Sequence, residues 1–107
     1  MTPENVSAII DTVKGTILPS ERIAMFNKAC AIDPHDTVVI EELSELIKAV
    51  SKINRCHNNK HLKSLMEEIA DVRIVIERIM RKYNIKEDDI DKLVVFKINR
   101  FIDQYDI

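Results

Sequence analysis

Residues 37–83 read TVVIEELSELIKAVSKINRCHNNKHLKSLMEEIADVRIVIERIMRKY and contain neither glycine nor proline. Sheets and tight hairpins usually need these residue types as punctuation, so their absence favours long helices. The single glycine, Gly15, and all the prolines lie in the first third of the chain. The central stretch therefore predicts an all-α fold.

Apolar residues in this stretch recur at steps of three and four, the spacing of one buried helix face. The first half carries Val39, Leu43, Leu46, Val50 and Ile53. The second half carries Leu62, Leu65, Ile69, Val72, Ile76, Ile79 and Tyr83. The polar residues 54–59 between the two halves predict a turn. Because short connections join antiparallel neighbours, we expect a helical hairpin.

Further helices are expected on both sides of the hairpin. Residues 3–18 predict a short helical segment, and Ser20 is suited to cap a helix that ends before the Asp33-Pro34 break. Asn84 is suited to a left-handed C-cap, and the acids at 87–89 favour the start of a last helix. One face of that helix carries Ile90, Val94, Ile98, Phe101 and Tyr105. We therefore predict a single domain over residues 1–107. It is a bundle of four main helices with a core at about 21–101 and an N-terminal appendage at 1–19.

Composition excludes several classes of function. The net charge is −2 and aromatic residues make up 5% of the chain, which argues against binding to duplex nucleic acid and against a base-stacking platform. No apolar run is long enough to cross a membrane, and no secretory signal is recognisable. Cys30 and Cys56 lie in helical patterns, so we expect reduced thiols in a cytoplasmic protein.

Acidic residues three positions apart are the most informative pattern. With 18 acids in 107 residues, about three such pairs arise by chance, so their number alone decides nothing. The sequence contains Asp33/Asp36, Glu42/Glu45, Glu68/Asp71, Asp88/Asp91 and Asp103/Asp106. Only the positions of these pairs in the fold can therefore distinguish a binding site from acids on solvent-exposed helix surfaces.

Two of these pairs are expected to lie level with each other across the hairpin. If the chain turns at Cys56-His57, antiparallel pairing places Glu45 beside Glu68 and Glu42 beside Asp71. Four converging carboxylates repel one another and raise their own pKa values unless a hard cation lies between them. Carboxylate oxygens favour Mg²⁺, Mn²⁺ or Ca²⁺ over thiophilic metals.

These residues also carry a resemblance to a known family. Two segments resemble the ExxE and ExxD motifs of the MazG-like, all-α nucleoside triphosphate pyrophosphatases. They are Glu-Glu-Leu-Ser-Glu-Leu at 41–46 and Glu-Glu-Ile-Ala-Asp-Val at 67–72. The resemblance covers roughly Glu21 to Phe101. It implies a homodimer or homotetramer in which the bundle is completed across a subunit interface.

The resemblance further implies an enzyme. Mg²⁺, with Mn²⁺ as a substitute, would be held by Glu42, Glu45, Glu68 and Asp71. The implied reaction hydrolyses a nucleoside triphosphate, often a deoxy or damaged one, to monophosphate and pyrophosphate with a metal-activated water. The implied catalytic residues are Glu41, Glu42 and Glu45, and Glu41 or Glu67 would orient or deprotonate the water.

Cations for the substrate phosphates are expected near the turn and late in the chain. The candidates are Lys48, Lys52, Arg55, Lys97 and Arg100. The alternative for each is ordinary ion pairing on a helix surface. Phe26 and Asn27 are candidates for contacting the base, although Phe26 also suits the core.

Other interpretations remain open. A non-catalytic helical interaction module accounts equally well for the apolar stripes but not for two level acid pairs. Phosphoribosyl-ATP pyrophosphatase shares the superfamily motif and is a further enzyme alternative. Cys56, His57 and His61 span the expected turn as an incomplete ligand set, and His35 follows a proline, so all four are interpreted as surface residues.

Overall fold

The computed structural model describes residues 5–30 and 36–105, and every regular element in these ranges is helical. The elements are α1 (Val6–Thr12), α2 (Ser20–Cys30), α3 (Thr37–Arg55), α4 (Asn59–Lys82) and α5 (Glu87–Tyr105). The predicted all-α fold class is confirmed. The helix start expected at Pro3 and the break at 33–35, which includes His35, lie outside the described residues.

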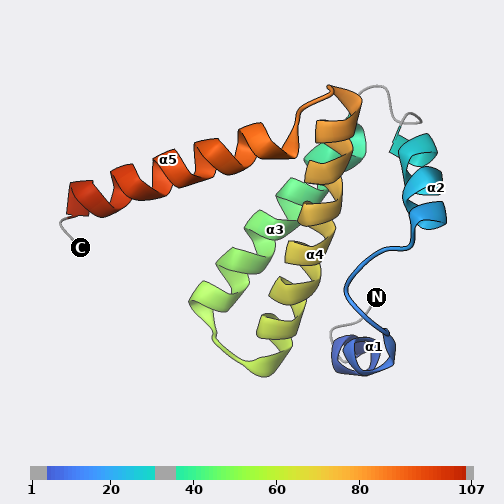
Figure 1. Cartoon of the computed structure of the whole chain (residues 1–107). Coiled ribbons are helices and arrows are strands. Elements are labelled where there is room, and N and C mark those ends of the chain that lie inside the picture. The colour runs from blue at the N-terminus through green and yellow to red at the C-terminus, as the bar shows by residue number, and fades with distance from the viewer. Residues whose placement is uncertain (1–4, 31–35, 106–107) are drawn as a thin grey trace.

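α3 and α4 form an antiparallel hairpin and run side by side (Figure 1). α3 ends at Arg55 and α4 begins after its cap Asn58, so the turn lies in the predicted polar stretch. The Asn58 side chain accepts a 2.8 Å hydrogen bond from the His61 backbone, and the His61 ring donates to the Cys56 carbonyl at 2.6 Å. His61 therefore stabilises the turn, and Cys56, His57 and His61 do not form a metal-binding group in the described part of the chain.

The two hairpin helices meet along a seam whose positions alternate in steps of three and four residues, as in a coiled coil. Each seam position is buried or half-buried. On α3 these positions are Val39, Glu42, Leu46, Ala49 and Ile53. On α4 they are Leu65, Glu68, Val72, Val75 and Ile79. One glutamate per helix thus occupies an otherwise apolar stripe.

This seam corrects the predicted buried face of α3. Leu43 and Val50 were predicted to be buried, but they are 41% and 50% exposed. The same correction applies on α4, where four residues of the predicted face are 39–58% exposed: Leu62, Ile69, Ile76 and Tyr83. Both helices carry two adjacent apolar stripes, and the seam uses the stripe that contains the glutamate.

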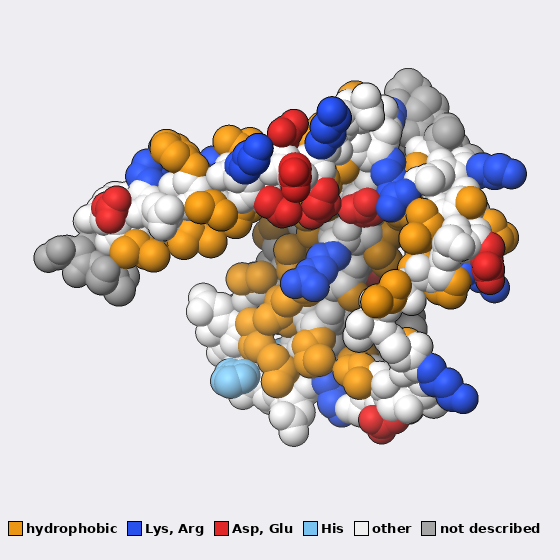
Figure 2. Space-filling model, in the orientation of Figure 1, with side chains coloured by type: hydrophobic (Ala, Val, Ile, Leu, Met, Phe, Trp, Pro, Cys, Tyr) orange, Lys and Arg blue, Asp and Glu red, His pale blue; other side chains and the backbone are white. Residues whose placement is uncertain are grey.

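The second stripes form an exposed surface that we call the front apolar face. It comprises Ile40, Leu43, Ile47, Val50, Leu62, Ile69, Ile76 and Tyr83. Most of these residues come directly after a seam residue in the sequence. In an antiparallel pair, such positions of both helices lie on the same side. Figure 2 shows hydrophobic side chains gathered on the hairpin and along the side of α5 that faces it.

α5 leaves the hairpin at a wide angle and packs extensively against no other helix (Figure 1). It has no buried residue, and Val94, Ile98, Phe101 and Tyr105 of its predicted apolar face are 47–59% exposed. The described part of a single chain therefore does not contain a closed four-helix bundle. None of the described helices combines the length and the apolar character needed to cross a membrane.

α1 and α2 lie beside α4, on the side away from α3 (Figure 1). Arg81 of α4 donates to the Asn27 side chain of α2 and lies over the Phe26 ring, 5.4 Å from its centroid. Phe26 and Asn27, the residues considered for base contact, thus join α2 to α4.

A long-range polar contact closes the open end of the hairpin. Asp36 at the N-cap of α3 has a positive φ of 53°, and its carboxylate accepts from Lys82 Nζ and from the Tyr83 hydroxyl, each at 2.8 Å. These partners hold the pKa of Asp36 below its usual value, the Lys82 hydrogen bond having the largest effect. Asn84 also has a positive φ, 55°, as predicted for a C-cap.

We expect Asp36→Asn to lower the thermal midpoint of unfolding. Asparagine tolerates the left-handed backbone and keeps one acceptor oxygen, so the variant removes mainly the charge that Lys82 and Tyr83 contact. The matched control is Glu77→Gln, which removes only a helix-surface pair with Arg81 (2.9 Å). Differential scanning calorimetry should show a larger loss for Asp36→Asn, and equal midpoints for both variants would contradict this role.

Candidate metal centre

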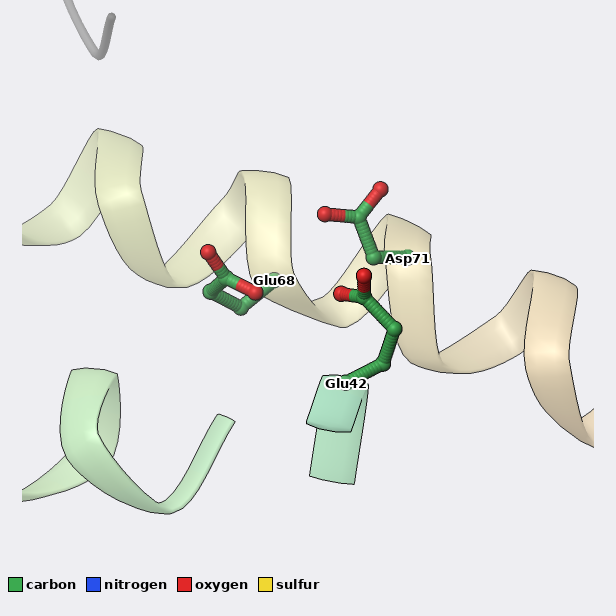
Figure 3. Close-up of side chains that lie close together, drawn as sticks. All are labelled: Glu42, Glu68 and Asp71. Carbon is green, nitrogen blue, oxygen red and sulfur yellow. The ribbon is translucent and has the colours of Figure 1, made fainter. Parts of the chain in front are cut away.

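Three carboxylates from the two hairpin helices converge at one point, which we call the acid centre. Glu42 of α3 and Glu68 and Asp71 of α4 each place one oxygen within 4.8 Å of the others. Figure 3 shows the three side chains pointing toward one another across the hairpin. The predicted level pairing of Glu42 with Asp71 is therefore present.

The seam explains why these carboxylates are partly removed from water. Glu42 lies between the seam residues Val39 and Leu46, and Glu68 lies between Leu65 and Val72. Asp71 follows Glu68 by three residues and therefore lies beside it on the same face of α4. All three residues of the acid centre are half-buried.

Burial and mutual repulsion raise the pKa values of both glutamates. For Glu42 the largest cause is desolvation, followed by the charges of Asp71, Glu45 and Glu41. For Glu68 it is again desolvation, followed by the charges of Asp71, Glu42 and Glu45. Glu68 Oε2 is buried, and no described residue hydrogen-bonds to it. A buried carboxylate oxygen without a donor is costly unless another group satisfies it.

The donor set fits a hard divalent cation. Oxygens that share one Mg²⁺, Mn²⁺ or Ca²⁺ ion at about 2.0–2.6 Å lie within about 5 Å of one another. Bound cation would offset the repulsion among three carboxylates and satisfy the buried oxygen of Glu68. Thiophilic metals are disfavoured because no cysteine or histidine joins the group among the described residues.

Glu45, the fourth predicted ligand, lies outside the acid centre. Its side chain is 51% exposed, and Glu45 Oε1 is 3.4 Å from Lys48 Nζ. Its charge still reaches the centre, because it raises the pKa of both Glu42 and Glu68. Glu41 is exposed and acts on Glu42 in the same way.

The predicted phosphate-binding cations are not gathered around the acid centre. Lys48 pairs with Glu45, whereas Lys52 and Arg55 are exposed further along α3. Lys97 and Arg100 lie on α5, which points away from the hairpin, and Arg100 lies 5.6 Å from the centroid of the Phe96 ring. Within the described chain, α5 therefore brings neither cation to the carboxylates.

One further cation was missed by the sequence reasoning. Arg78 of α4 follows Asp71 by seven residues, which places both on the same helix face about 10 Å apart along the axis. Arg78 is half-buried, and its charge lowers the pKa of Asp36.

We expect the metal-free protein to become more stable as the pH falls from about 7 to about 5. Raised pKa values for Glu42 and Glu68 mean that the folded protein binds more protons than the unfolded chain in this range. The two charged glutamates lower the free energy of unfolding by their full amount above the folded-state pKa. This loss disappears below the unfolded value of about 4.5. The lowered pKa of Asp36 has the opposite effect only at more acidic pH.

Urea unfolding in EDTA at both pH values measures this dependence. The double variant Glu42→Gln, Glu68→Gln should lose most of the gain. An equal gain in the variant would show that other groups produce it.

Comparison of the chain with protein-family models, with curated proteins and with solved structures found no match. Function must therefore be argued from the geometry and chemistry of the site itself.

Proposed function

We propose that the protein is a Mg²⁺-dependent nucleoside triphosphate pyrophosphohydrolase. The observation that carries this proposal is the convergence of Glu42, Glu68 and Asp71, with a buried oxygen of Glu68 that lacks a donor among the described residues. Three carboxylates on two packed helices suit Mg²⁺, because this ion is usually held by few protein carboxylates and also binds substrate phosphates. The sequence resemblance to MazG-like enzymes names these three residues together with Glu45.

The reaction breaks the bond between the α- and β-phosphates with one water molecule and yields monophosphate, pyrophosphate and a proton. Bound Mg²⁺ would neutralise phosphate charge and make the attacking water more acidic. Glu42, Glu68 and Asp71 would hold and orient that ion, while Glu41, to which the resemblance gives this role, would orient the water and accept its proton. We assign the far end of the phosphate chain to Arg78, because its seven-residue spacing from Asp71 puts both residues on one face of α4.

We further propose that a homodimer or homotetramer completes the bundle. Monomeric proteins rarely expose contiguous apolar surface on the scale of the front apolar face together with α5. A second chain seated on these surfaces would bury them and bring Lys97 and Arg100 of one copy toward the acid centre of another. The proposed enzyme is cytoplasmic, where nucleotides are abundant.

The exposed apolar surface also supports a second candidate, a non-catalytic interaction module. Such a module needs the front apolar face and α5 but no metal. Phosphoribosyl-ATP pyrophosphatase remains the alternative enzyme, because it shares the superfamily motif.

Pyrophosphate release tests these candidates together. The substrates are canonical and modified NTPs and dNTPs and phosphoribosyl-ATP, each with Mg²⁺, with Mn²⁺ and with EDTA. We expect metal-dependent release of pyrophosphate and monophosphate from nucleoside triphosphates. Release from phosphoribosyl-ATP alone would favour the alternative enzyme. No release from any substrate by a folded, oligomeric protein would favour the interaction module.

A further inference from the structure

A pocket of about 290 Å³ lies between α1 and α4 and borders the acid centre. Its apolar wall consists of Val6, Ile9 and Ile10 of α1 with Met66 and Ala70 of α4. The other two lining residues are Glu67 and Asp71. Asp71 also belongs to the acid centre, so the pocket and the centre share this residue.

The size of the pocket suits one flat ring system. Its volume lies at the lower end of the range for small-molecule sites, which is about 300–1,000 Å³. On α4 the lining residues span a single turn, from 66–67 to 70–71, which is about 6 Å along the axis. Apolar walls on two helices with a few polar groups are typical of such sites.

The polar groups in the lining define the chemistry of the occupant. Among the lining residues that the structure describes, Glu67 and Asp71 carry the polar side chains, and ionised carboxylates accept hydrogen bonds but do not donate them. A base with an exocyclic amino group, such as cytosine or adenine, offers a donor, whereas uracil and thymine present a carbonyl oxygen at that position. The lining therefore favours an amino-bearing base.

We propose that this pocket binds the amino-bearing base of the triphosphate substrate, with its phosphates at the acid centre. The inference rests on the proposed function and adds the substrate class. It also gives α1 a role. Val6 is 8% exposed and anchors α1, whereas Ile10 is 57% exposed and is available to cover a bound base.

Filling the pocket tests its role in binding. Ala70→Leu adds bulk inside the pocket without changing a carboxylate, and Ala8→Leu makes the same change on an exposed part of α1 that does not line it. We expect Ala70→Leu to raise KM for ATP and CTP at least about tenfold, since a change of this size in a binding pocket discriminates at that level. Ala8→Leu should leave KM unchanged. Both variants should retain helicity and stabilisation by Mg²⁺.

The base preference of the enzyme tests whether the carboxylates of the pocket select an amino-bearing base. The full-length protein should favour CTP over UTP and ATP over ITP at least about tenfold in kcat/KM, and Glu67→Gln should reduce both ratios because an amide can donate as well as accept. A role of Glu67 in orienting water would instead lower kcat for all four nucleotides equally.

The outcomes separate this inference from the proposed function. If the wild-type protein releases pyrophosphate but Ala70→Leu keeps the wild-type KM, the base pocket is wrong and the proposed function stands. A preference for UTP over CTP overturns the choice of base. If no nucleotide is hydrolysed or bound, even with Ca²⁺ in place of Mg²⁺, both proposals fail together.

Discussion

Glu68→Gln should reduce metal-dependent pyrophosphate release at least about 100-fold while making the metal-free protein more stable. Activity falls because the buried carboxylate no longer helps to hold the cation. Stability in EDTA rises because one of three repelling charges is removed, and the new amide donates to Glu42 or Asp71. Wild-type protein should gain thermal stability when Mg²⁺ is added, and the variant should gain little.

Glu42→Gln and Asp71→Asn should each abolish turnover for the same reason and leave helicity intact. Glu77→Gln is the matched control on α4, because Glu77 pairs with Arg81 and lies outside the acid centre. Circular dichroism and calorimetry, with and without Mg²⁺, accompany the activity assay. Retained activity in any of the three variants would exclude that residue as a ligand. Lost activity with reduced stability in EDTA would indicate misfolding instead.

Ile98→Glu should convert the oligomer to a monomer and lower the unfolding midpoint. Ile98 is 52% exposed in the single chain, so a charge at this position should cost little stability in a monomer. In an oligomer that covers α5, the same charge would be buried without a partner. Ile47→Glu on the front apolar face should act in the same way, since Ile47 is 71% exposed.

Two controls separate an interface from a general effect of charge. Asn99→Glu adds the same charge to the neighbouring position of α5, and Ser51→Glu adds it to the outer side of α3; both residues are exposed. Sedimentation equilibrium should show wild-type mass for these controls and the monomer mass for Ile98→Glu. If the wild-type protein is monomeric at high concentration, no second chain covers α5 and the proposed oligomer is wrong.

Local signals in the sequence predicted the helices well. The turn before Asn58, the left-handed cap at Asn84 and the acidic start of α5 at Glu87 are all present. Each depends on residues within one or two helical turns, where capping and dipole effects act. The pairing of Glu42 with Asp71 was also predictable, because a short turn fixes which residues of the two helices lie level.

Features that depend on how the helices pack against one another were not predictable from the sequence. Leu43 and Glu42 are neighbours, and either begins a stripe of suitable spacing, so periodicity alone did not show which one enters the seam. Glu45 lies one residue before the seam position Leu46 and is 51% exposed beside Lys48. The contacts of Asp36 with Lys82 and Tyr83 join residues more than forty positions apart, where sequence patterns carry no signal.

An anomalous difference map from crystals of the protein soaked in Mn²⁺ tests whether the acid centre binds a divalent cation. We predict a peak between the carboxylates of Glu42, Glu68 and Asp71, with metal–oxygen distances of about 2.0–2.3 Å. Such a peak should be absent from crystals of Glu68→Gln soaked in the same way. An empty acid centre in the wild-type crystals, with the three carboxylates still converging, would contradict the account.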